Sequence, residues 1–314
     1  MADKKAIIDE TQFEAQYDAE AKLLLAQKPF LANILVHTVK DYIGLNPCDV
    51  EKLIEGEPYI STIPVEPGFT NSVQIKGMNS ENKVRNEGVA YFDILFYVRT
   101  SDGLSKVIIN IEAQKSEPID YDVEMRGLYY AIREVSSQLD REFDSQNYND
   151  IKKVYSIWIC MNEKDNMLEK IYLTKNDIIG ISRWKDMYEI VNVVIIRLAK
   201  TLDLQTEHEL HRFLGALFLP ELSAEEKNDM LENEFDIKME GDRKELLKSM
   251  CNLSQGIKEQ GIEQGIEQGR REERISTLVT FFKNDGTVAA AKQMLNSSDE
   301  DIKIAKERLS MIEE

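Results

Sequence analysis

The chain has 314 residues, of which 42% are hydrophobic and 31% are charged, and its formal net charge at pH 7 is −18. This composition is typical of a soluble globular protein with one or two domains, and no apolar run reaches the roughly 18 residues that a membrane span needs. The negative charge counts against a nucleic-acid-binding protein with a basic face, although a local basic patch and bound cations can still hold DNA on an acidic protein.

The cysteines and the N-terminus favour a cytoplasmic protein without a membrane segment. Cys48, Cys160 and Cys251 are odd in number, far apart and in no Cys-x-x-Cys pair, a usage typical of a reducing compartment. The first residues lack the apolar core of a secretory signal.

The first elements are expected to be helices. Apolar residues recur at intervals of three and four between about residues 14 and 43, and Pro29 is expected to begin a second helix because proline suits a first turn. Asp18 and Glu20 lie on the first helix. They either point toward a functional site or face solvent as first-turn charges, and both interpretations stay open.

The next stretch has little periodicity. A short helix is expected at residues 49–53, and the recurrent glycine and proline of residues 57–88 predict a loop with one short strand at residues 73–75. Glu87 lies just ahead of the first strong strand pattern and is a candidate acid near a functional site.

Residues 91–115 predict a β-hairpin, because two apolar runs flank a turn at residues 100–103 that contains Asp-Gly. Asp93 in the first run, and Glu112 and Gln114 in the second, are polar residues that a buried strand does not need. Antiparallel pairing brings these three to the same end of the hairpin. Converging carboxylates in an apolar setting repel each other unless a cation lies between them. The pattern therefore predicts a divalent-metal site.

A long helix and further strands are expected after the hairpin. Residues 121–143 have an amphipathic pattern with the apolar stripe Met125, Leu128, Ile132, Val135 and Leu139. Arg126 and Gln138 lie on this segment and are either directed toward the hairpin carboxylates or solvated. Apolar runs predict strands at residues 153–161, within 168–182 and at 187–198. Strands that alternate with long helices predict an α/β fold.

Beyond residue 203 the pattern is helical. Helices are expected at residues 207–219, from 223 onward and at 242–253. Ser223 and Glu226 form a predicted capping box at the start of the second. His208 and His211 have a spacing that suits a metal ion, but the sequence shows no further ligands near them, so a packing role is favoured.

Residues 255–270 form a four-residue repeat of the type Gly-Ile-Glu-Gln. A period of four is close to one helical turn, so glycines and isoleucines follow neighbouring stripes of a helix. Each glycine costs about 1 kcal/mol relative to alanine, so this helix needs a partner and is interpreted as a linker or an oligomerisation stalk. Further helices are expected at residues 271–283, 288–295 and 299–312, with Ser298 or Asp299 as an N-cap.

The chain resembles the PD-(D/E)XK nuclease superfamily, and within it the bacterial recombination-promoting nuclease and transposase proteins. The resemblance covers about residues 15–270 and is carried by the segments EGVAYFDILFYV, VIINIEAQ, MRGLYYAIREVSSQ, IKKVYSIWICMN and the glycine repeat. It implies a restriction-endonuclease-like α-β-β-β-α-β core with a mixed sheet, followed by a helical C-terminal extension. The expected parts are a nuclease-like domain, a helical extension, a repeat helix and a helical tail at residues 1–203, 204–254, 255–270 and 271–314.

The resemblance also implies roles for the hairpin residues. The aspartate and glutamate of the family motif fall on Asp93 and Glu112, which would bind a metal ion together with the backbone carbonyl of Ala113. The third position falls on Gln114, where the superfamily usually has a lysine; glutamine can orient water but carries no charge. Lys115 is adjacent, and strand alternation points it to the opposite face unless a bulge redirects it. Glu87, Arg126 and Gln138 are candidate supporting residues.

We therefore predict a metal-dependent DNA endonuclease that uses Mg²⁺, with Mn²⁺ as a substitute, and that acts in recombination or transposition. A homo-oligomer through the helical C-terminal region is also expected. Two other interpretations stay open. In the first, the chain is a nuclease-fold protein of weak or no activity that binds DNA or assembles, which Gln114 and the acidic composition favour. In the second, Asp93 and Glu112 simply pair with buried arginines.

Overall fold

A computed structural model of the chain describes residues 16–17, 19–60, 94–101, 103–112, 122–144, 146–181, 189–201, 208–295 and 297–313. One compact unit spans residues 15–252, and another contains residues 253–314. Each unit has its own hydrophobic core. Within the described ranges, no helix is both long enough and apolar enough to cross a membrane.

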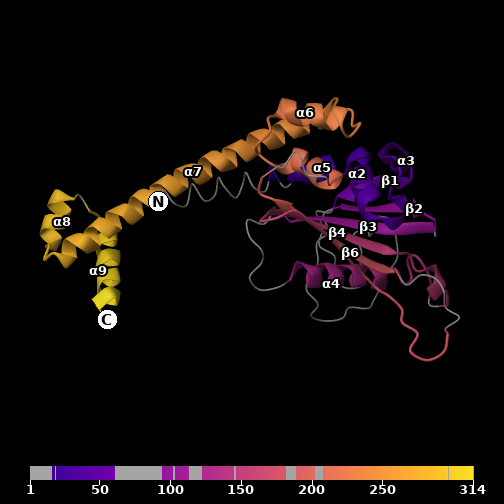
Figure 1. Ribbon diagram of the computed structural model, residues 1–314, viewed down its shortest axis with the longest axis horizontal. Helices are drawn as coiled ribbons and strands as arrows, with labels where there is room; N and C mark the ends of the chain where they lie inside the picture. Colours follow the sequence, from indigo (N-terminus) through magenta and orange to yellow (C-terminus); the bar gives the residue numbers. More distant parts are fainter. Residues whose placement is uncertain are drawn as a thin grey trace. The chain divides into compact units, whose positions relative to one another are not determined.

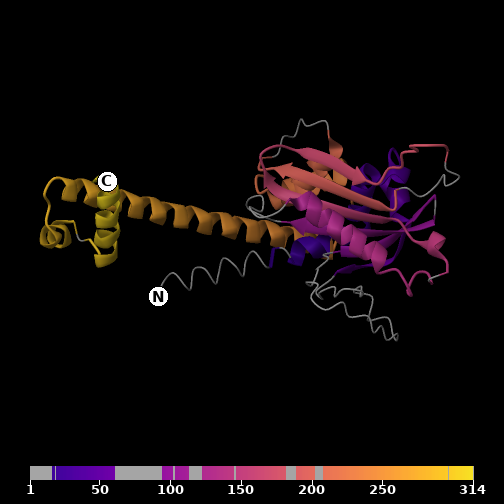
Figure 2. The same ribbon diagram turned by 90° about the horizontal axis from the view of Figure 1, so that it is seen from below.

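The larger unit is built on a six-stranded mixed sheet with the strand order β1-β2-β3-β4-β6-β5. The β3–β4 and β4–β6 pairs are parallel, and the other three pairs are antiparallel. The strands are β1 Ile54–Ile60, β2 Ile94–Thr100, β3 Gly103–Glu112, β4 Val154–Glu163, β5 Met167–Tyr172 and β6 Val191–Ala199. Helices lie against both faces of this sheet (Figure 1, Figure 2), so the predicted α/β class with a mixed sheet is confirmed.

The predicted hairpin is present as β2 and β3. Thr100 pairs with Gly103 at the turn, and the antiparallel register continues to Ile94 opposite Ile109. Gly103 has φ +112°, a backbone conformation that favours glycine. The Thr100 hydroxyl donates to the Gly103 carbonyl at 2.9 Å and lies 3.2 Å from the Ser105 hydroxyl, which closes the turn.

Strand β1 corrects the prediction that residues 57–88 are a loop with one short strand, because residues 57–60 belong to it. It pairs with β2, and the register is irregular between Glu55 and Tyr59. Gly56 has φ +61° there, and Pro58 is tolerated because β1 is an edge strand, where a missing backbone donor breaks no inner ladder. The short strand predicted at residues 73–75 lies outside the described residues.

Helix α4 (Val123–Ser136) packs against β4 and β6. Its predicted apolar stripe is only partly correct, because Leu128 and Val135 pack against the core and the other members are exposed. Met125 and Ile132 are 62% and 51% exposed. The helix faces the sheet through Gly127 instead, where an added Cβ would lie only 2.7 Å from Val193 Cγ1. A glycine at the point of closest approach lets the helix backbone lie directly on the sheet. The buried positions of this helix are Val123, Gly127, Tyr130, Ala131 and Glu134.

Helix α4 is also shorter than the predicted helix of residues 121–143. It ends at Ser136, and the Ser137 hydroxyl donates to the Glu134 carbonyl at 2.9 Å. Asp140 then adopts φ +61°, a left-handed conformation that cannot continue a right-handed helix. The segment between this turn and β4 includes the short 3-10 helix η3 (Tyr148–Asp150).

The opposite face of the sheet is covered by helices α2 (Lys28–Thr38) and α5 (Glu209–Phe218) (Figure 1). Residues 19–25 are helical, and α2 begins with Pro29 in its first turn, as predicted. The short helices η1 (Lys40–Tyr42) and α3 (Pro47–Glu51) follow. Buried residues of this core include Phe30, Leu35, Ile157, Ile196 and Phe213.

The predicted helical extension contributes to this same core. Helix α6 (Ala224–Asn233) begins with the predicted capping box, in which the Glu226 amide donates to the Ser223 hydroxyl and the Ser223 amide donates to the Glu226 carboxylate. Leu231, Leu247 and Met250 are buried together with the helices of the sheet face. These residues therefore form part of the larger unit.

Helix α7 (Asp242–Lys283) contains the whole glycine repeat in one continuous helix of 42 residues. It joins the two helices that were predicted on either side of the repeat. Helices α8 (Val288–Met294) and α9 (Asp299–Glu313) follow. Ser298 accepts a hydrogen bond from the Asp301 amide at 3.1 Å and so caps α9. The C-terminal unit buries Ile275, Leu278, Ala291, Ile302 and Ala305.

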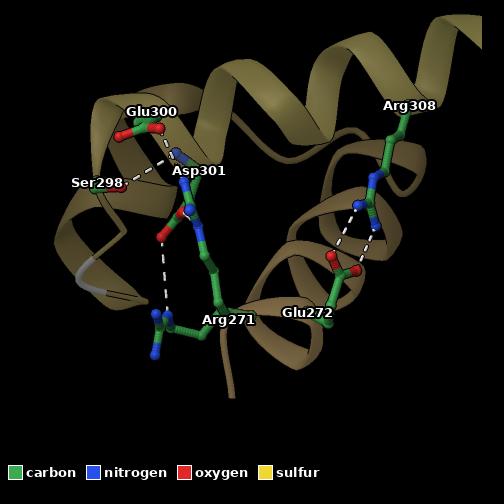
Figure 3. A network of polar contacts seen from close by, with 7 residues as sticks. Arg271, Glu272, Ser298, Glu300, Asp301 and Arg308 are labelled. Atoms are coloured by element: carbon green, nitrogen blue, oxygen red, sulfur yellow. Dashed lines mark hydrogen bonds and ion pairs between the residues drawn. The ribbon is translucent and has the colours of Figure 1, made fainter. Parts of the chain in front are cut away.

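Ion pairs join α7 to α9 around this small core (Figure 3). Arg308 contacts both carboxylate oxygens of Glu272, at 2.7 and 3.0 Å. Arg271 contacts Glu300 at 2.9 Å and Asp301 at 3.3 Å. Because most of these side chains are exposed, each pair stabilises the unit only modestly.

Candidate functional site

The structure describes part of the predicted site. Arg126 and Gln138 lie in described segments, and the backbone of Glu112 ends β3. The remaining predicted residues lie outside the described ranges, namely Glu87, Asp93, Ala113, Gln114 and Lys115. The structure therefore describes the predicted site as far as the end of β3.

The end of β3 lies beside two other strands in a regular register. Glu112 pairs with Cys160 of β4, and Cys160 pairs with Arg197 of β6. One step earlier on the same face of β4, Trp158 pairs with Asn110 of β3. Cys160 and Trp158 are buried in the core that the sheet shares with α4. The end of β3 therefore lies beside β4, and β6 lies one strand further along the sheet.

Arg126 is held over this part of the sheet by two aromatic rings. Its guanidinium carbon lies 5.3 Å from the Trp158 ring and 5.5 Å from the Tyr130 ring. The indole N–H of Trp158 donates to the Ser156 hydroxyl at 2.8 Å, which fixes the orientation of the ring. The faces of aromatic rings attract a guanidinium electrostatically. Arg126 therefore lies at a defined place near the start of α4, next to the tight contact that Gly127 makes with the sheet.

Arg197 is a part of this region that the sequence reasoning missed. Its guanidinium contacts Glu124 of α4 at 2.5 Å and also Glu169 of β5. Burial opposes the charged forms, but the hydrogen bonds to these carboxylates raise the pKa of Arg197, and the guanidinium keeps the pKa of Glu124 low. A lone arginine in the apolar run VNVVIIRL is the sequence signal that could have identified it. A hollow of about 370 Å³ beside it is lined by Glu124, Glu163, Lys164, Asp165, Met167, Glu169 and Arg197.

Gln138 lies at the other end of α4 and is not brought near Glu112. Its side-chain amide donates to the Lys152 carbonyl at 3.0 Å and accepts from the Lys152 amide at 2.8 Å. Cys160, the neighbour of Glu112, is eight residues further along, which corresponds to roughly 26 Å of extended strand. The glutamine thus joins the turn after α4 to the start of β4.

The three histidines of the chain gather in one place, although the sequence showed no further ligand near His208 and His211. His37 comes from α2, and its Nε2 lies 3.8 Å from Glu209 Oε2. His211 Nε2 lies 3.1 Å from the Met167 carbonyl. In the part of the chain that is described, however, no three His, Cys, Asp or Glu side chains are arranged to hold a metal ion. The histidine cluster brings α2 and the start of α5 together.

A comparison with protein families decides what kind of protein this is. A family model described as PD-(D/E)XK nuclease family transposase matches residues 64–257, which is more than half of the chain. The chain belongs to this family. No curated protein and no solved structure matches it. In this PD-(D/E)XK family member, the matched region includes Asp93, Glu112 and Gln114 and extends into the start of the glycine repeat. The predicted resemblance to PD-(D/E)XK nucleases is thereby confirmed.

Proposed function

We propose that this protein is a Mg²⁺-dependent DNA endonuclease that hydrolyses phosphodiester bonds in recombination or transposition. The observation that carries the proposal is the family match across residues 64–257, which includes the whole Asp93…Glu112-x-Gln114 motif. The order α2, β1, β2, β3, α4, β4 supports a restriction-endonuclease-like α-β-β-β-α-β core. A cytoplasmic location accords with the spacing of the cysteines.

The proposed metal ligands are the carboxylates of Asp93 and Glu112 and the backbone carbonyl of Ala113. This donor set consists of oxygen atoms, which Mg²⁺ and Mn²⁺ prefer to the nitrogen and sulfur ligands of zinc sites. When bound, the metal lowers the pKa of a water molecule and neutralises charge on the phosphate. Glu112 ends β3 next to the buried Cys160, so the ligand strand is fixed by the sheet.

The remaining residues would bind and orient the substrate. Gln114 positions the attacking water through its amide, which donates and accepts hydrogen bonds. Arg126 binds a phosphate oxygen from its place over Trp158. Glu87 and Lys115 are further candidates close to the motif in sequence. Gln138 has a structural contact with Lys152, so the proposal gives it no part in binding.

Nicking of a supercoiled plasmid tests the endonuclease directly. Wild-type protein should nick the plasmid with Mg²⁺ and not with EDTA, and Asp93→Ala or Glu112→Ala should abolish nicking because each removes a metal ligand. Asp229→Ala is the matched control, since Asp229 is an exposed carboxylate of α6 in the same unit. Circular dichroism checks that each variant is folded. Variants at 93 and 112 that nick as fast as wild type would contradict the assignment.

A second candidate is a DNA-binding or assembly protein that has kept the nuclease fold and lost cleavage. Gln114 at the usual lysine position and the net charge of −18 favour it. Calorimetric titration separates the two proposals. Binding of Mg²⁺ or Mn²⁺ that Glu112→Ala abolishes supports the endonuclease, and the absence of any metal binding supports the second candidate.

The proposed function includes self-association through the glycine repeat of α7. Ile262 and Ile266 are 54% and 51% exposed on this helix. An added Cβ at Gly261, Gly265 or Gly269 would meet no other atom within 4 Å. Each exposed glycine costs about 1 kcal/mol relative to alanine, and a second copy of the helix packed on these stripes offsets that cost. The partner proposed is therefore another copy of this chain.

A further inference from the structure

A hollow of about 320 Å³ lies on the face of the sheet that α2 covers. This volume is at the lower end of the roughly 300–1,000 Å³ that is typical of small-molecule sites. The walls come from the end of α2, the segment that follows it, β5 and the start of β6, and none of the lining residues has a part in the proposed function. The lining residues that matter for binding are Lys40, Ile43, Leu168, Lys170, Tyr172 and Glu189.

Lys170 is held at this hollow by two tyrosine rings. Its Nζ lies 5.2 Å from the centre of the Tyr155 ring and 5.8 Å from the centre of the Tyr172 ring. Tyr155 and Tyr172 both pair with Asn192, so the two rings flank one row across the sheet. Lys170 pairs with Val194, two residues further along β6 and therefore on the same face. Aromatic faces attract an ammonium group without neutralising its charge.

The carboxylates near Lys170 are engaged with other groups. Glu189 forms an ion pair with Lys40 at 3.2 Å. Asp41 accepts hydrogen bonds from the Ser101 amide at 2.8 Å and from the Ser101 hydroxyl at 2.6 Å. Among the described residues, the Lys170 ammonium makes neither an ion pair nor a hydrogen bond. Lys170 can therefore bind a ligand without breaking a contact of this kind.

The charges around Lys170 favour an anion. Burial lowers the pKa of Lys170, and the negative charges of Glu189 and Asp41 oppose this lowering. The positive charges of Lys40 and Lys153 add to it. The three lysines thus exceed the two carboxylates by one positive charge, in a chain whose net charge is −18. A bound anion would relieve both the repulsion between the lysines and the cost of burying an ammonium group.

We propose that this hollow binds a nucleoside 5′-monophosphate, with its phosphate on Lys170 and Lys40 and its base on the apolar part of the wall. A phosphate monoester carries a charge of about −1.5 to −2 at pH 7, which matches two ammonium groups better than a carboxylate does. Lysine binds phosphate as a point charge, so two lysines can converge on one phosphate. Ile43 and Leu168 are 66% and 40% exposed in the wall of the hollow. A flat base would remove this apolar surface from water.

Titration calorimetry of the full-length protein with adenosine 5′-monophosphate (AMP) tests the phosphate contact. EDTA is present throughout, so the result does not depend on the predicted metal site. Lys170→Met should raise the Kd for AMP by roughly 10- to 100-fold, as the loss of a charge-assisted hydrogen bond does. Lys244→Met should keep the wild-type Kd, because Lys244 is an exposed lysine of the same unit outside the hollow. Wild-type protein that does not bind millimolar AMP overturns the inference, and so does a wild-type Kd in Lys170→Met.

Ribose 5-phosphate, which has no base, tests the apolar contact. AMP should bind more tightly than ribose 5-phosphate, and Ile43→Ser should weaken the binding of AMP while the Kd for ribose 5-phosphate stays the same. Equal affinity of the two compounds overturns the nucleotide as the ligand. A 5′-phosphorylated oligonucleotide that competes with AMP and binds more tightly also overturns it, because the site would then hold the end of a DNA strand.

Chemical protection tests the same site in the wild-type chain and stays decisive if a variant does not fold. Acetic anhydride should modify Lys170 more slowly when AMP is bound, whereas the rate at Lys244 should not change, as measured by mass spectrometry of the peptides. An unchanged rate at Lys170 under saturating AMP overturns the inference. Protection of Lys170 in a protein that never cuts DNA supports the inference and counts only against the endonuclease.

Discussion

Gly127 sets the rotational phase of α4, and this single position decides which residues of the helix reach the sheet. The apolar residues Met125 and Ile132 define the stripe that periodicity selects, yet both are more than half exposed. The helix turns instead toward Val193 and Trp158, which occupy the space that a side chain at 127 would fill. The arginine next to the glycine is placed over Trp158 of β4 by the same contact.

Gly127→Ala is expected to destabilise the protein by about 1–3 kcal/mol, because the new methyl group overpacks a tight contact. Gly256→Ala is the matched substitution, since an added Cβ at Gly256 meets nothing within 4 Å. It should leave stability unchanged or raise it by up to about 1 kcal/mol through helix propensity. Urea unfolding followed by circular dichroism measures both. Equal stability of the two variants would contradict the packing argument.

Sequence indicates some of the candidate residues and not others. Polar residues in apolar strands predict a site at Glu112 and its neighbours, because burial of such groups needs a reason, and this assignment stays a prediction. Arg197 escaped notice although it is just such a residue, because its partners Glu124 and Glu169 come from elements 73 and 28 residues away. Gln138 is a polar residue that can bind substrate, so the sequence makes it a candidate supporting residue. Its hydrogen bond to the Lys152 backbone follows only from the folded structure.

At the scale of elements, the histidine cluster joins α2 to α5. Burial lowers the pKa of both His37 and His211, and the contacts with Glu209 and the Met167 carbonyl offset this lowering only in part. The neighbouring His208 adds to the lowering in each case. Nδ1 of His211 is buried and has no hydrogen-bond partner among the described residues. The contact between α2 and α5 is therefore more stable when the imidazoles of His37 and His211 are neutral.

This contact predicts that stability falls in mild acid. The unfolded chain binds protons with a histidine pKa of about 6.5, whereas the folded chain binds them only at lower pH. Stability is therefore complete above about pH 6.5 and is lost as the pH falls toward the folded pKa values. Urea midpoints at pH 7.5 and 5.5 should show this loss, and His37→Gln with His211→Gln should reduce it. An unchanged pH dependence in the double variant would rule out these histidines as its source.

The elements themselves were predicted well where the local pattern is strong. The β2–β3 hairpin follows from its Asp-Gly turn, and α6 follows from the Ser223–Glu226 capping box. Strand β1 was missed because Gly56 and Pro58 normally indicate a loop. Its pairing with β2 shows that an edge position tolerates both residues. Edge or inner position is a property of the whole sheet, so local sequence could not reveal it.

At the scale of the whole molecule, two separate cores predict that self-association and the nuclease fold can be separated by mutation. Ile262 and Ile266 contribute to neither core, since both lie exposed on α7. Substitution there should change assembly and leave both cores intact. Buried positions such as Leu278 would confound this experiment, because they stabilise the C-terminal unit itself.

Light scattering coupled to size-exclusion chromatography measures the assembly. The wild-type chain should elute at about twice its mass of 36.2 kDa, and the double substitution Ile262→Glu, Ile266→Glu should return it to the monomer mass because charge is costly in an apolar interface. Glu267→Gln is the control, an exposed neighbour that the proposal leaves outside the contact. A monomeric wild-type chain at tens of micromolar would end the proposal.

The continuous helix through the glycine repeat has a consequence for how such a chain can change in evolution. A tandem repeat in a gene gains and loses copies readily, and here each copy adds four residues to α7. Four residues lengthen a helix by about 6 Å and advance its rotation by about 40° beyond a full turn. A change in the number of copies would therefore alter the length of α7 in fixed steps. It would introduce no new type of residue and would leave the helix unbroken.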